Sequence, residues 1–178
     1  MRRYPKEESA WCDLLMAQLG AGQKEVSQRT CVSILGHLAE FREDPWSDWL
    51  LQICVLPPLA AGDSRRLLAL AEHQVQKERS AINLFSLGAA RYRAGQFEQA
   101  VASLEEAIQW RQKKERCEAW LFLALAQQRL GKSHEAGKGL EKAINLLDKQ
   151  PRRRWSEQIY LQILRKEAEG LIRGEKTK

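Results

Sequence analysis

The stretch "LGAARYRAGQFEQAVASLEEAIQ" spans residues 87–109, and a closely similar one, "LALAQQRLGKSHEAGKGLEKAIN", spans residues 123–145. In each stretch a glycine, Gly95 or Gly131, separates two segments whose apolar residues recur every three or four positions. This spacing predicts two amphipathic helices joined by a tight turn, because glycine adopts the left-handed backbone that such turns need. A helix pair of this size cannot bury its apolar face alone. The repetition therefore predicts that helix pairs stack on one another.

The same apolar spacing continues through most of the chain, and no segment shows the sustained alternation that is typical of strands. Within the repeated unit, Gly88 and Ala100 are small enough to let two helix backbones approach closely, while Leu104 fills the space beside them. The predicted fold class is all-α. Its predicted architecture is an α-solenoid of about four helix-turn-helix repeats with a C-terminal capping helix.

Composition is consistent with one domain covering residues 1–178. Hydrophobic residues make up 44% of the chain and charged residues 29%, so the chain has enough apolar residues for a core. No apolar run approaches the roughly 18 to 20 residues that cross a bilayer, and no apolar stretch follows the first arginines. We therefore expect a cytoplasmic protein without membrane contact.

The net charge of +6 is concentrated in the second half of the chain. Residues 1–90 contain 10 Lys and Arg against 11 Asp and Glu, whereas residues 91–178 contain 19 against 12. A positive field over the second half attracts an acidic partner or a phosphate backbone, and it is also what a solvated basic surface produces.

The repeated unit resembles the tetratricopeptide repeat, a helix-turn-helix of about 34 residues. The resemblance rests on the large and small residues that this family places at fixed positions. In the first copy these are Leu84, Leu87, Gly88, Gly95, Ala100, Leu104 and Ala107, and in the second Trp120, Leu123, Ala124, Gly131, Ala136, Leu140 and Ala143. The tyrosine that the family favours at its eleventh position is absent, being Arg91 in one copy and Gln127 in the other.

Weaker copies of the pattern precede these two. One can be aligned by taking Gly62 as its turn glycine, with a first helix that Pro57-Pro58 cuts short, and an earlier one turns at Gly22. The predicted repeats cover approximately residues 8–43, 46–80, 81–114 and 117–150. An apolar stripe that begins at Trp155 predicts a capping helix over residues 155–172, followed by a frayed tail over residues 173–178.

The arrangement over roughly residues 46–172 is also similar to repeat segments near the C-termini of large bacterial signalling proteins, among them serine/threonine kinases. This similarity implies that the chain is either a free-standing relative or a segment that lacks a catalytic domain.

No motif of a common enzyme class is present. The sequence lacks a P-loop, a dinucleotide-binding glycine motif, HExxH, GxSxG and the kinase loop signatures. Its four cysteines, Cys12, Cys31, Cys54 and Cys117, form no CxxC pair and are expected to be buried free thiols. The sequence therefore predicts a protein that is not an enzyme, with no catalytic residue, no cofactor and no metal site.

In the tetratricopeptide family the first helix of each repeat lines a concave face, and that resemblance implies a set of groove residues here. Arg93 and Arg129 occupy one place in successive repeats and are suited to pair with a peptide carboxylate, although arginines at these positions could instead cap their own helices. Aromatic and aliphatic neighbours suit the apolar anchors of a helix or an extended peptide. The predicted partner-binding groove comprises Phe85, Ala89, Tyr92, Arg93, Leu121, Leu125, Gln128 and Arg129.

The predicted function is a non-enzymatic protein–protein interaction scaffold that binds a peptide or helix of a partner protein in this groove. A rival function is that of a nucleic-acid-associated adaptor, since Arg152, Arg153 and Arg154 form a basic patch beside Trp155, an arrangement that can hold a single strand. Trp155 also fits the apolar stripe of the capping helix. A third function, a regulatory repeat segment of a kinase-like protein, would use the same binding mechanism in cis.

Overall fold

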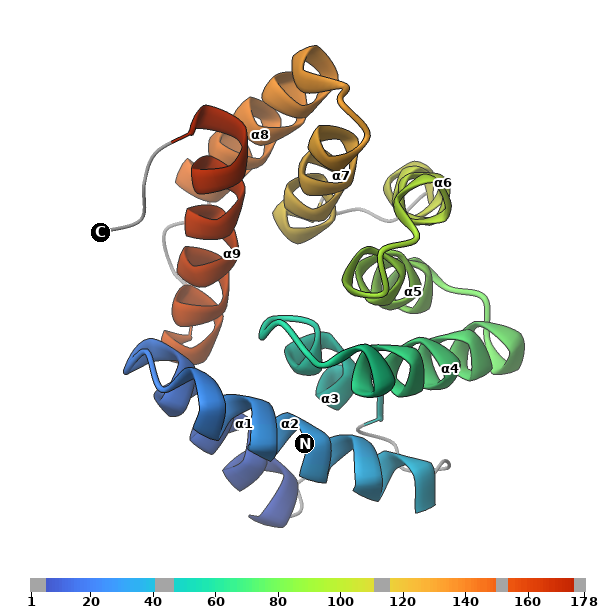
Figure 1. Ribbon diagram of the computed structural model, residues 1–178, viewed down its shortest axis with the longest axis vertical. Coiled ribbons are helices and arrows are strands. Elements are labelled where there is room, and N and C mark those ends of the chain that lie inside the picture. Colours follow the sequence, from blue (N-terminus) through green and yellow to red (C-terminus); the bar gives the residue numbers. More distant parts are fainter. Residues whose placement is uncertain (1–5, 41–46, 111–115, 150–153, 175–178) are drawn as a thin grey trace.

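The computed structural model describes residues 6–40, 47–110, 116–149 and 154–174. These residues form nine α-helices and no strand, which confirms the predicted all-α fold class (Figure 1). The helices are α1 (Lys6–Gly20), α2 (Lys24–Glu40), α3 (Ser47–Cys54), α4 (Ala61–Lys77), α5 (Ala81–Arg93), α6 (Phe97–Gln109), α7 (Cys117–Arg129), α8 (Ser133–Asp148) and α9 (Trp155–Arg173).

Left-handed glycines make the turns of three helix pairs. Gly22, Gly95 and Gly131 have φ values of 71°, 78° and 77°, and they follow α1, α5 and α7. After α5, the amide of Gln96 donates to the carbonyl of Arg91, and the amide of Gly95 donates to that of Tyr92. This pattern of bonds is the Schellman motif, which satisfies the last carbonyls of a helix. The sequence signal of Gly95 and Gly131 therefore has a direct structural cause.

The helices within a pair pack closely where the sequence places small residues. Gly88 of α5 lies against Leu104 of α6, so close that a Cβ at this position would stand 2.6 Å from Leu104 Cγ. Ala100 and Leu104 are fully buried. Each second helix also packs against the first helix of the next pair, as α4 does against α5 and α6 against α7. One continuous hydrophobic core results.

The second pair departs from the expected repeat. Gly62 is not its turn glycine, because it lies in the first turn of α4 and lacks the positive φ of the other turn glycines. The connection is made instead by the residues after α3, a helix of only eight residues that ends just before the Pro57-Pro58 pair. Proline cannot donate a backbone hydrogen bond, which explains why α3 is so short.

The last helix, α9, does more than cover the end of the stack. It packs against α7 and α8 at one end of the molecule and also against α1 at the other. In Figure 1 the first eight helices form an arc, and α9 spans its open side from α8 to α1. At the α1 contact, a Cβ built on Gly20 would lie 3.3 Å from Ile159 Cδ1. Because α9 contacts both ends of the arc, it closes the solenoid.

Candidate functional site

Five of the predicted groove residues lie in the protein core. Phe85, Ala89, Leu121 and Leu125 are fully buried, and Tyr92 is 5% exposed. Two edge-on ring contacts to Phe122 of α7 hold the aromatic members together, with ring centroids 5.9 Å away for Phe85 and 5.8 Å for Tyr92. The structure brings these side chains together, but they offer little surface to a partner.

Arg93 lies at the junction of three helices that are far apart in the sequence. Its Nη1 and Nη2 atoms donate to the two carboxylate oxygens of Glu167 on α9, at 2.6 and 2.7 Å. Its Nε atom donates to the carbonyl of Val55, and Nη2 also donates to that of Leu56, 2.9 Å away. Both carbonyls follow the last residue of α3. Arg93 therefore links α5 to α3 and α9 and does not cap its own helix.

Arg93 is buried beside an opposite charge and an aromatic ring. The side chain is 7% exposed, and its guanidinium carbon lies 5.3 Å from the ring centroid of Tyr92. Burial by itself would lower the pKa of Arg93, but the hydrogen bonds and charge of Glu167 outweigh burial, and the pKa is raised. A buried bidentate pair of this kind is among the stronger polar interactions in proteins.

Arg129 does not share this environment, although it recurs 36 residues after Arg93. Its side chain is exposed at the end of α7, and Gln128 beside it is half-buried. Burial, and next the charge of Glu167, raise the pKa of Tyr92, while Arg129 lies close enough to the phenol to oppose that rise. Arg129 is the predicted groove residue most accessible to a partner.

A second arginine, Arg116, makes a further link on the concave side, which the sequence did not predict. It lies just before α7 and donates to Gln52 Oε1 of α3 at 2.9 Å, pairs with Glu118 at 3.5 Å, and stacks 5.0 Å above the ring of Phe85. Nothing in the repeat pattern marks Arg116, because it precedes the first helix of its repeat.

Tyr160 and Glu167 of α9 also belong to this site and were not predicted from the sequence. Tyr160 is buried, and its hydroxyl has no hydrogen-bond partner among the described residues. Burial, and then the charge of Glu118, raise its pKa. The available signal was the four-residue spacing of Tyr160, Leu164 and Ala168, all of which are buried.

Of the predicted basic patch, only Arg154 lies within the described residues; Arg152 and Arg153 lie outside them. Arg154 is exposed immediately before α9. Trp155 is 50% exposed, so its expected place in the buried stripe of α9 is wrong. It begins the helix, and the buried stripe starts five residues later, at Tyr160.

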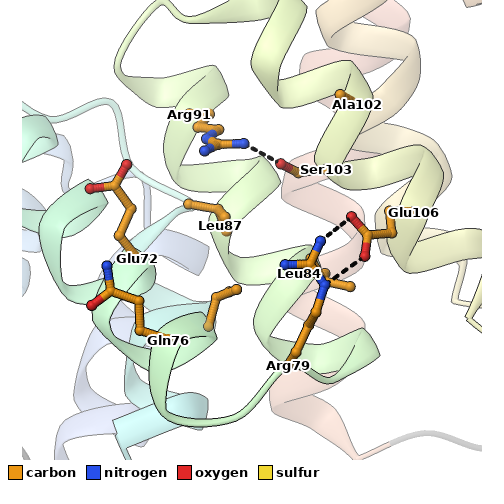
Figure 2. A pocket seen from close by; sticks show the side chains of 10 residues that line it. Glu72, Gln76, Arg79, Leu84, Leu87, Arg91, Ala102, Ser103 and Glu106 are labelled. Carbon is orange, nitrogen blue, oxygen red and sulfur yellow. Dashed lines mark hydrogen bonds and ion pairs between the residues drawn. The ribbon is translucent and has the colours of Figure 1, made fainter.

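Figure 2 shows a separate hollow of about 440 Å³ between α4, α5 and α6. Leu84 and Leu87 line this hollow, and two polar contacts join its walls. Arg79 makes a bidentate ion pair with Glu106 at 2.7 and 2.9 Å, and Arg91 donates to Ser103 Oγ at 2.6 Å. Ser103 in turn donates to the carbonyl of Gln99 in its own helix. The hydroxyl of Ser103 therefore accepts a hydrogen bond from Arg91 and donates one to Gln99.

The described residues include four cysteine thiols, at Cys12, Cys31, Cys54 and Cys117. All four cysteines are buried and free, as expected. The pKa of Cys54 is raised by burial and then by Cys31, which disfavours the reactive thiolate. Among the described residues, no group of His, Cys, Asp and Glu side chains is arranged to hold a metal ion. Nor does any helix of the described segments combine the length and apolar character needed to cross a membrane.

Comparison with known proteins gives one match. The family model described as tetratricopeptide repeat matches residues 81–114, the segment that contains α5 and α6. No curated protein and no solved structure matches the chain. Tetratricopeptide repeats generally mediate contacts between proteins, which indicates a scaffold role in protein–protein interaction. The chain therefore carries a tetratricopeptide repeat at residues 81–114, within an all-α fold of stacked helix pairs.

Proposed function

We propose that the chain is a non-enzymatic scaffold that holds a helix of a partner protein on its concave side, along α5 and α7. The observation that carries this proposal is the way in which the chain holds α9. That helix lies along the concave side with one apolar stripe buried and one carboxylate paired to Arg93. An amphipathic helix in a groove is a common mode of peptide recognition.

Accessible residues at the edge of this side provide a way to test the proposal. Arg129 is exposed on α7, whereas Glu105 is exposed on α6, a second helix of its pair. We would replace each in turn by a photo-crosslinking amino acid, in the full chain, and irradiate it in extract from the native cells. A partner on the concave side should form a protein adduct from position 129 and not from position 105. Adducts only from position 105 would contradict the proposal.

The rival function, nucleic-acid binding, remains a defined outcome of the same experiment. It is favoured by the exposed Trp155 next to the exposed Arg154, since an aromatic ring flanked by arginine can stack on a base. Nuclease treatment before irradiation should leave a protein–protein adduct unchanged. If nuclease abolishes the adduct, or if binding to single-stranded RNA falls steeply with salt and requires Arg154, the adaptor function replaces the scaffold function.

A further inference from the structure

We infer that α9 is an internal ligand, and that the partner replaces it with a helix of the same chemistry. That helix carries apolar side chains four residues apart, as at Tyr160, Leu164 and Ala168, and a carboxylate at the place of Glu167. This inference rests on the proposed function and adds to it the nature of the partner helix and the conformational step that admits it.

The contacts of α9 are one-sided, as those of a bound helix would be. Tyr160, Leu161, Leu164 and Ala168 are buried, whereas Gln158, Gln162 and Lys166 are exposed. The pairs α5–α6 and α7–α8 are packed together by their own core residues, such as Leu104 and Leu140. A second helix with the same apolar stripe could therefore take the place of α9 without rebuilding these pairs.

Part of what orients Arg93 lies outside α9. Two carbonyls after α3, those of Val55 and Leu56, hold the guanidinium of Arg93 and fix the direction of its remaining N–H groups. Those groups form the fork that binds Glu167. A preorganised fork recognises a carboxylate with little loss of side-chain freedom, so it selects for an acidic residue in the partner helix.

The fit of α9 is also incomplete, which leaves room for a competitor. The hydroxyl of Tyr160 is buried without a partner among the described residues, and a helix with phenylalanine at that place avoids the cost of burying it. The side chain of Glu167 is 31% exposed, so water reaches the ion pair at its edge. A partner helix that also covers this edge would hold Arg93 more tightly than α9 does.

The first test uses a fluorescent peptide with the sequence of residues 155–173, added to the full chain and followed by anisotropy. Glu167→Gln in the chain weakens the conformation in which α9 is bound, because Arg93 then faces an uncharged glutamine. The conformation without bound α9 is not affected, since Glu167 does not contact Arg93 there. The affinity for the peptide should then rise about tenfold or more over that of the wild-type chain, since a larger fraction of molecules is open. The matched control is Glu169→Gln, because the ion pairs of Glu169 within the described part of the chain join it to Arg165 and Arg173 of its own helix.

The peptide itself supplies a second comparison. A peptide in which the residue equivalent to Glu167 is changed to glutamine should lose the gain, because the vacated fork of Arg93 then meets no carboxylate. Equal affinity of the two chain variants, Glu167→Gln and Glu169→Gln, would overturn the inference. So would equal affinity of the two peptides for the Glu167→Gln chain.

A disulfide lock tests the same step without weakening the fold. A Cβ built on Gly20 lies 3.6 Å from Ile159 Cγ2 and 3.9 Å from Cγ1, so the two positions face each other across the contact between α1 and α9, where a disulfide can be introduced. In the chain with Gly20→Cys and Ile159→Cys, oxidation should abolish peptide binding and reductant should restore it. Equal binding in the oxidised and reduced forms would show that α9 need not move.

The lock also separates the two proposals. If the oxidised chain still forms the protein adduct from position 129, the partner binds the concave side without displacing α9, and only the inference fails. If neither form gives that adduct while the peptide binds only after reduction, the internal ligand is real but the proposed scaffold function fails.

Discussion

Arg93 shows how one side chain can hold distant parts of a repeat protein together. Its hydrogen bonds reach α3 and α9, 37 to 74 residues away in the sequence. The repeat pattern would also be satisfied by many other residues at this position. The choice of arginine is explained by the two carbonyls and the carboxylate that meet it.

We expect Arg93→Ala to lower the free energy of unfolding by about 3 to 5 kcal/mol, because the change leaves Glu167 and two carbonyls without their donor. Arg129→Ala should lower it by only about 0.5 to 1.5 kcal/mol, since that side chain is exposed and its loss affects the Tyr92 phenol beside it. Urea unfolding followed by circular dichroism measures both. Similar losses for the two variants would mean that the ion pair of Arg93 contributes little to stability.

Removal of the Tyr160 hydroxyl, which has no partner among the described residues, is expected not to lower the free energy of unfolding. Tyr160→Phe removes a buried polar group that has no described partner, so it should leave the protein as stable as before or more stable by about 1 kcal/mol. Tyr92→Phe is the control, because Arg129 lies beside that phenol, and we expect it to cost about 0.5 to 1.5 kcal/mol. A clear loss for Tyr160→Phe would point to a partner for its hydroxyl.

At the scale of the elements, two glycines inside helices allow the effect of close packing on stability to be measured separately from the effect of helix propensity. Gly88→Ala places a Cβ 2.6 Å from Leu104 Cγ and 3.3 Å from the backbone nitrogen of Leu104, so it should destabilise by about 1 to 3 kcal/mol. Gly137 lies within α8 with nothing within 4 Å of an added Cβ, and Gly137→Ala should stabilise by about 0.5 to 1 kcal/mol. Thermal melts of the two variants should therefore shift in opposite directions. A shift of both in the same direction would contradict the packing at Gly88.

The elements that the sequence predicted well are those in which the structural cause is local. Gly95 and Gly131 each set a turn by their own backbone conformation, and Gly88 and Ala100 set the helix contact by their size. Gly62 misled the alignment because a glycine also fits the first turn of a helix, and the prolines before it made the connection instead.

The candidate site was predictable only in part. The apolar groove residues follow from the resemblance to the tetratricopeptide repeat, and the structure shows that they are buried. The pairing of Arg93 with Glu167 depends on where α9 arrives after the stack has curved, and that curvature is the sum of small rotations between successive pairs. No local sequence pattern encodes the total curvature of the stack. For the same reason the partners of Arg116 could not be predicted.

For the whole molecule, alkaline pH should be destabilising. The pKa values of Tyr92 and Tyr160 are raised in the folded protein, first of all by burial, whereas an unfolded tyrosine ionises near a pKa of about 10. Above that pH the unfolded chain binds fewer protons than the folded one, so the free energy of unfolding falls as pH rises. The raised pKa of Cys54 acts with the same sign from about pH 8.5 upward.

Urea unfolding between about pH 8 and about pH 11 measures this dependence. The Tyr160→Phe variant should show a shallower fall than the wild-type protein, because one of the groups that retain a proton on folding has been removed. Identical slopes for the two proteins would mean that burial of Tyr160 does not govern its ionisation.

The contact of α9 with both ends of the arc has a consequence for how this protein can change in length. A helix of 19 residues is about 28 Å long, comparable with three spacings of about 9 Å between packed helices. The gap that α9 bridges is set by the curvature of the arc and by the number of pairs in it. An open solenoid gains or loses a unit at little cost, whereas here a change in the number of pairs would alter the gap between the two ends. The length of the last helix is therefore matched to the number of pairs, and a chain with a further repeat would need a last helix of a different length to contact both ends.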